Sequence, residues 1–130
     1  MISKSNIFIF SLVFALFISL SGCRTAPIYN PTDIPLNSKA KMADVEKAIV
    51  RAGKSLRWNM KTVKPGFITA TLYNRSHTAI VDITYTTKSF SIQYKDSVDL
   101  NYDGNTMIHK NYNNWVTNLE RKIQMEVSSL

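Results

Sequence analysis

The sequence predicts an α+β fold, a two-layer sandwich in which an antiparallel meander of three or four strands carries an N-terminal and a C-terminal helix on one face. Two changes in the spacing of apolar residues predict it. Apolar residues recur at helical spacing over residues 45–52, alternate at every second position over 56–94, and return to helical spacing over 108–127. A meander has one apolar face to offer, so both helices are expected to bury their stripes there.

The first helix is expected from about Lys39 to Ala52, with one apolar stripe made by Val45, Ala48, Ile49 and Ala52. Asn37 or Ser38 can cap its start, and Gly53 stands where a helix is expected to stop.

Four short alternating segments then predict the meander. The first, around Leu56 to Met60, can be irregular, which would leave three regular strands. The connections are expected at Lys64-Pro65-Gly66, near Asn74 to His77, and at Thr87-Lys88-Ser89.

A polar loop from Asp96 to Asn105 leads into the strongest helical pattern of the chain. Its stripe comprises Ile108, Tyr112, Trp115, Val116, Leu119, Ile123 and Val127. We expect Trp115 and Leu119 to be central in the core.

The N-terminal region has the order of a signal peptide. Residues 1–22 contain Lys4, then an apolar run without any acidic residue, then small residues. The unbroken apolar run is shorter than the roughly 20 residues that a membrane span needs. Residues 23–38 contain three prolines and are expected to form an extended tether, which leaves residues 39–130 as one small domain.

The leader ends in Leu20-Ser21-Gly22-Cys23, which resembles the lipobox of bacterial lipoproteins. The resemblance implies cleavage before Cys23, a diacylglycerol on its thiol and acylation of the freed amine, which together anchor the protein to a lipid bilayer. By similarity to the sorting pattern of Gram-negative lipoproteins, Arg24 implies the outer membrane, with the domain facing the periplasm. The alternative is a secreted protein with a spare thiol. Cys23 is the only cysteine, so a disulfide framework is excluded.

Three further stretches resemble a set of small, uncharacterised Gram-negative lipoproteins. They are Gly66 to Ala70, His77 to Val81 and Ile108 to Val116. The resemblance implies location and fold, and it assigns no chemical role to any residue.

Positive charge is concentrated in one segment. Beyond residue 22 the chain has 15 basic and 9 acidic residues, and residues 39–64 alone hold eight basic and two acidic ones, which accounts for the whole excess. This segment is either a solvated helix face or a contact surface for anionic lipid headgroups, lipopolysaccharide phosphates or an acidic partner. The candidate contact residues are Lys47, Arg51, Lys54, Arg57 and Lys61. Nucleic acid suits the charge but not the expected compartment.

The sequence shows no catalytic constellation and implies no cofactor. His77 and His109 fall at a turn and at a helix start, and Asp82 falls on the solvent-facing side of a strand. Asp99 to Gly104 begins like an EF-hand calcium loop, but the twelfth position is Lys110 instead of Glu. The alternative is an ordinary turn rich in Asp, Asn and Gly.

These observations favour a non-enzymatic, membrane-tethered interaction domain in envelope assembly, maintenance or stress tolerance. A secreted-type inhibitor or ligand sensor is the alternative, although the positive charge suits a basic target enzyme badly. An enzyme acting on cell-wall material ranks third, because paired acids are not evident.

The lipid anchor gives the first testable prediction. Replacing Cys23 by Ala removes the thiol that the lipobox resemblance assigns to acylation, so metabolic labelling with a fatty acid should be lost. The protein that survives should leave the membrane fraction. Unchanged labelling together with unchanged membrane association would contradict the assignment.

Overall fold

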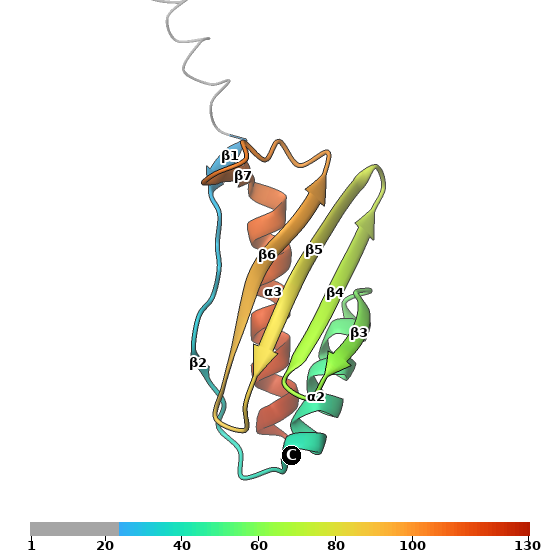
Figure 1. Ribbon diagram of the computed structural model, residues 1–130, viewed down its shortest axis with the longest axis vertical. Helices are drawn as coiled ribbons and strands as arrows, with labels where there is room; N and C mark the ends of the chain where they lie inside the picture. Colours follow the sequence, from blue (N-terminus) through green and yellow to red (C-terminus); the bar gives the residue numbers. More distant parts are fainter. Residues whose placement is uncertain (1–23) are drawn as a thin grey trace, which may run out of the picture.

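The computed structural model describes residues 24–130, so the expected signal peptide, the lipobox and Cys23 lie outside the described residues. Within them the predicted α+β sandwich is confirmed: five antiparallel strands in the order β2-β6-β5-β4-β3 form a sheet, and both helices cover one of its faces (Figure 1). The elements of this sandwich are β2 (Ile34–Pro35), α2 (Met42–Ser55), β3 (Asn59–Lys64), β4 (Phe67–Asn74), β5 (His77–Tyr85), β6 (Ser89–Val98) and α3 (Lys110–Ser128). A separate two-stranded sheet pairs β1 (Thr25–Pro27) with β7 (Met107–His109).

Helix α2 begins and ends three residues later than the sequence predicts. Its N-cap is Lys41, without a side-chain capping bond, while Ser38 accepts a hydrogen bond from the Ala40 amide (3.0 Å) ahead of the helix. Gly53 does not stop the helix. It is buried in the last turn, and the Met60 side chain of β3 occupies the space that a Cβ at position 53 would need. The glycine therefore allows the close approach of β3 to α2.

The core lies between the sheet and the helix pair. Helix α3 contributes Tyr112, Val116, Leu119, Ile123 and Val127, all fully buried. The expectation of a central Trp115 is wrong, because Trp115 is only partly buried and packs at the border of the core. It lies beside Leu56 and Leu72, at the edge of the α3 stripe that faces the end of α2.

The expected tether is extended but docked on the domain. The Ile92 amide donates to the Pro31 carbonyl (2.8 Å), Ile34 pairs with Phe90, and the Leu36 amide donates to the Lys88 carbonyl (2.8 Å). Residues 28–36 therefore cover the edge of β6, whose backbone amides would otherwise need other partners. Burial of Leu36 in the core adds an apolar contribution to this docking.

The other face of the sheet is polar, as the alternation predicts. Asp82 accepts a hydrogen bond from the Thr69 hydroxyl (3.0 Å) and lies 3.5 Å from the Lys95 ammonium. At the far edge, β3 carries the exposed Lys61 and Lys64, and its register with β4 shifts between Thr62 and Lys64. Charged side chains and such irregularities are typical of edge strands that avoid pairing with other chains.

Two apolar residues of α3, Leu119 and Trp115, should differ in how much they contribute to the stability of the fold. Replacing the fully buried Leu119 by Ala should lower the free energy of unfolding by about 2–5 kcal/mol, since it removes buried methyl groups and leaves a cavity. Replacing the partly buried Trp115 by Ala should cost clearly less. Urea denaturation followed by far-UV circular dichroism measures both, and an equal or larger loss for Trp115 would contradict its place at the border.

Candidate functional site

Three of the five candidate contact residues share one surface. Lys47, Arg51 and Lys54 are exposed and lie on the side of α2 opposite the buried Val45 and Ile49. Their spacing of four and three residues brings successive side chains onto one helix face. We call these three residues the α2 basic face.

One member of the α2 basic face is tied to the neighbouring helix. The Arg51 guanidinium lies 3.6 Å from the Glu126 carboxylate of α3, and the Lys122 ammonium lies 3.6 Å from the other oxygen of the same carboxylate. Exposed pairs of this kind contribute little to stability. Among residues 24–130, Lys47 and Lys54 have no carboxylate within 4.0 Å, so their charges are available to a partner.

The other two candidates lie elsewhere. Met60 faces α2, and side chains alternate along a strand, so the next residue, Lys61, projects from the opposite face of the sheet. Arg57 lies in the connection between α2 and β3, with a left-handed backbone (φ 69°). The five residues therefore do not form one patch, although they follow one another closely in the chain.

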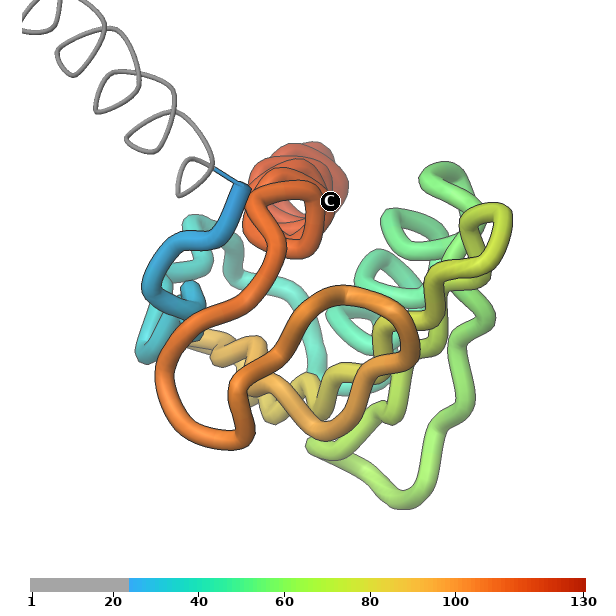
Figure 2. The backbone as a smooth tube through the Cα atoms, turned by 90° about the horizontal axis from the view of Figure 1, so that it is seen from above, coloured from blue at the N-terminus to red at the C-terminus, as the bar shows by residue number. Residues whose placement is uncertain are grey.

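The α2 basic face is also distant from the start of the described chain. Figures 1 and 2 show that α3 lies between β1 and α2. After β1 the chain runs along the sheet edge to the opposite end of the molecule, and α2 begins there (Figure 1). The basic segment thus follows the expected anchor in sequence but not in space.

A shallow hollow of about 410 Å³ adjoins the α2 basic face. It is lined by Glu46, Lys47, Val50, Arg51 and Thr62, so it lies between α2 and the edge strand β3. A half-buried valine beside two basic side chains offers a partner both an apolar contact and positive charge.

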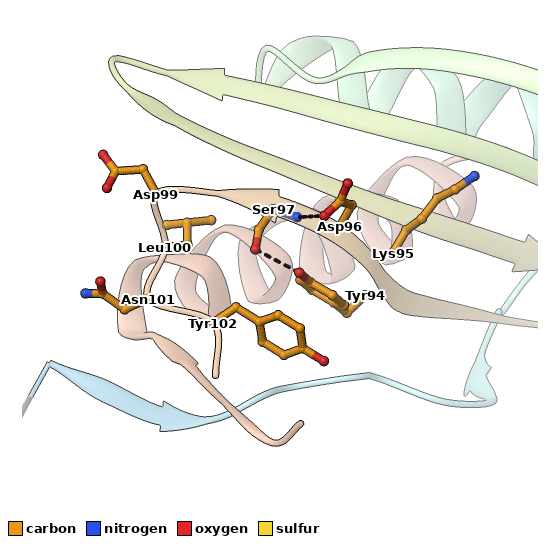
Figure 3. Close-up of a pocket in the computed structure, with 8 residues that line it drawn as sticks. All are labelled: Tyr94, Lys95, Asp96, Ser97, Asp99, Leu100, Asn101 and Tyr102. Atoms are coloured by element: carbon orange, nitrogen blue, oxygen red, sulfur yellow. Dashed lines mark hydrogen bonds between the residues drawn. The ribbon is translucent and has the colours of Figure 1, made fainter. Parts of the chain in front are cut away.

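A second hollow, of about 520 Å³, lies where β6 leads into the loop before β7, and Figure 3 shows its eight lining residues. The Tyr94 and Ser97 hydroxyls are hydrogen-bonded to each other (2.8 Å), and Asp96 accepts from the Ser97 amide (2.8 Å). The carboxylates of Asp96 and Asp99 lie apart in Figure 3. The hollow therefore lacks the convergent acids that acid–base hydrolysis requires.

The loop that begins like a calcium site is built around Asp103. One carboxylate oxygen of Asp103 accepts hydrogen bonds from the amides of Asn105 (2.8 Å), Thr106 (2.9 Å) and Met107 (3.1 Å). These bonds, with Met107 first, hold the pKa of the Asp103 carboxyl below its usual value, because they stabilise the charged form. Asp103 thus closes the turn that leads into β7.

The fold brings together two histidines that lie far apart in the sequence. The rings of His77 and His109 lie 6.4 Å apart, and His77 also lies 6.3 Å from the Trp115 ring. His109 is the N-cap of α3, where its Nδ1 accepts a hydrogen bond from the Asn111 amide (3.0 Å). The Nδ1 of His77 is hydrogen-bonded to the Asp99 carbonyl (2.6 Å). Both Nδ1 atoms therefore hold local structure.

Within residues 24–130, no group of three His, Cys, Asp or Glu side chains could hold a metal ion. Neither described helix is long and apolar enough to cross a membrane. Comparisons with protein-family models, with curated proteins and with solved structures give no match to this chain.

The Asp103 turn yields a prediction with a matched control. Replacing Asp103 by Ala should speed amide hydrogen exchange at Asn105, Thr106 and Met107, since it removes their shared acceptor, whereas Asp103→Asn retains a carbonyl oxygen and should change exchange less. In the unsubstituted chain the lowered pKa means that this protection is complete above the carboxyl's unfolded-state pKa. It should fade as pH drops through the folded-state pKa. Identical exchange in both variants would contradict this role.

Proposed function

We propose that this chain is a lipid-anchored envelope protein whose domain acts by docking onto an anionic surface through the α2 basic face. The anchor rests on the lipobox resemblance at Cys23, and outer-membrane placement rests on Arg24. The observation that carries the docking role is the cluster of Lys47, Arg51 and Lys54 on one exposed side of α2. Docking in this way would serve envelope assembly, maintenance or stress tolerance without chemistry.

The start of the described chain supports a short anchor. The Arg24 carbonyl accepts a hydrogen bond from the Lys110 amide (3.0 Å), and Thr25 already pairs with His109. Only the bond between residues 23 and 24 separates a lipid on Cys23 from this docked strand. The anchored domain would therefore sit against its membrane with the β1–β7 end, instead of being held tens of ångströms away.

This orientation favours a partner other than the anchoring bilayer. Helix α2 lies on the far side of α3 from β1 (Figures 1 and 2), so the α2 basic face would face sideways or away from the membrane that holds the anchor. An acidic protein surface in the envelope fits this geometry better than the headgroups around the anchor. The adjoining hollow around Val50 offers the same partner an apolar contact.

Strand addition is a weaker route for docking. Among the described strands of the large sheet, β2 and residues 28–36 cover the edge at β6, and the edge at β3 is marked by lysines and a register shift. A partner strand would have to pair beside exposed Lys61 and Lys64, which favours side-chain docking on α2 over β-augmentation.

The docking role predicts a charge-dependent, site-specific interaction. The triple change of Lys47, Arg51 and Lys54 to Gln should leave the unfolding midpoint nearly unchanged, because exposed charges on a helix contribute little to stability. A chain of residues 24–130, exported without lipid, should cross-link to an acidic envelope component, and the triple variant should lose this product. Raising the salt concentration should weaken this cross-linking, since screening limits the distance over which exposed charges interact to about 8 Å at physiological ionic strength.

The matched control is the triple change of Lys88, Lys110 and Arg121 to Gln, which alters net charge equally at exposed positions away from α2. Co-sedimentation with phosphatidylglycerol-containing and purely zwitterionic vesicles separates lipid from protein partners. Strong binding to anionic vesicles alone would make headgroups the partner, with a loss of about two orders of magnitude on removing three charges. Equal losses in both triple variants would contradict a specific face.

A further inference from the structure

A third hollow, of about 440 Å³, lies between the α2–β3 connection and the β4–β5 turn. Its lining is Leu56, Arg57, Leu72, Tyr73, Asn74, Arg75 and Trp115. Two arginines that are far apart in the chain thus border one concave surface, and the partly buried Trp115 of α3, which packs against the core, lines it with them. We call this site the arginine pocket. It is separate from the α2 basic face, although Arg57 adjoins the end of that helix.

Arg57 is held by the end of α2. Its amide donates to the Lys54 carbonyl (3.0 Å), and the following Trp58 amide donates to the Gly53 carbonyl (2.9 Å). Trp58 is itself buried in the core. These bonds fix Arg57 in a left-handed conformation (φ 69°), which residues with a Cβ seldom adopt.

Arg75 is held in the same way from the other side. It occupies the turn between β4 and β5, also with a left-handed backbone (φ 56°). The turn is fixed by a hydrogen bond from the Ser76 hydroxyl to the Asp99 carboxylate (2.8 Å) and by His77, whose ring packs near Trp115. Both arginines therefore stand on hydrogen-bonded, strained turns, and strained backbone often marks a binding site.

The charge of the arginine pocket is uncompensated. Among residues 24–130, neither Arg57 nor Arg75 has a carboxylate within 4.0 Å, while Arg51, Lys95 and Lys122 do. Two like charges bordering one hollow repel each other, and a bound dianion would remove that repulsion. A guanidinium also presents paired N–H donors that match the oxygens of a phosphate group.

The aromatic lining indicates what the phosphate would be attached to. Trp115 is partly buried, so its ring borders the hollow with surface to spare, whereas Tyr73 follows the core-facing Leu72 and its side chain projects from the other face of the sheet. A flat apolar ring beside charged donors suits a ligand with a charged end and a ring-like body. Asn74 adds an amide that can both donate and accept hydrogen bonds.

We propose that the arginine pocket binds a phosphate monoester carried on a sugar ring or on a lipid headgroup, with Arg57 and Arg75 holding the phosphate and Trp115 contacting the body. The site does not depend on the anchor or on the α2 basic face. It would give the domain a ligand-sensing or glycan-binding role in addition to docking.

The test uses the full lipidated chain in a neutral detergent, titrated with glucose 1-phosphate and, separately, with micelles containing phosphatidic acid. Isothermal titration calorimetry should show saturable binding of at least one of these phosphate monoesters. Arg57→Gln and Arg75→Gln should each weaken it about tenfold or more, since each removes a charge-assisted hydrogen bond. Arg57→Lys and Arg75→Lys should give intermediate losses, because Lys keeps the charge and loses the paired donors.

The control is Lys39→Gln with Lys88→Gln, two exposed lysines outside the arginine pocket. Tighter binding of glucose 1-phosphate identifies a sugar phosphate as the source, and tighter binding of phosphatidic acid identifies a lipid headgroup. Absence of saturable binding to both probes overturns the proposal, as does a loss in the arginine variants no larger than in the control. Because Lys47, Arg51 and Lys54 are unchanged throughout, a failure here leaves the docking role standing.

Discussion

Two helices bury their apolar residues on one face of the same sheet, and this packing fixes where the α2 basic face and the arginine pocket lie. Helix α3 lies along the sheet centre, so α2 must pack between α3 and the edge strand β3. Gly53 makes this packing possible, because the Met60 side chain fills the space beside its Cα. With α2 held on three sides, one side remains for solvent, and the α2 basic face lies there. The same packing places Arg57 beside the β4–β5 turn.

Much of the fold could be predicted because core burial leaves a periodic trace. The alternation in β4, β5 and β6 and the stripe of α3 follow directly from residues that face the core. Elements of two or three residues leave no such trace, so β1, β2 and β7 were missed. The predictions for Gly53 and Trp115 were wrong for a related reason. In a sequence, a glycine that makes room for a neighbouring side chain cannot be told from one that ends a helix, and an apolar residue at the border of a stripe cannot be told from one at its centre.

The candidate site was predicted only in part, since charge density along the chain does not specify a face. Helical spacing correctly predicts that Lys47, Arg51 and Lys54 lie on one face of α2. Lys61, in contrast, lies on a strand, and the alternation of side chains makes it project from the sheet face opposite the helices. Pairs such as Arg57 with Arg75, or His77 with His109, arise from strand register and helix docking over long sequence separations. A single sequence carries no local signal for such pairs.

The docked segment before α2 has a consequence for the order in which the chain is completed. Residues 25–36 are synthesised early, yet their partners in β6, β7 and α3 are synthesised late. Until these partners have been synthesised, the backbone of residues 25–36 remains unpaired. Pro27, Pro31 and Pro35 have no amide hydrogen, so the unpaired segment pairs poorly with strands other than its own partners. The three prolines thus suit a segment that docks last, once α3 has been synthesised.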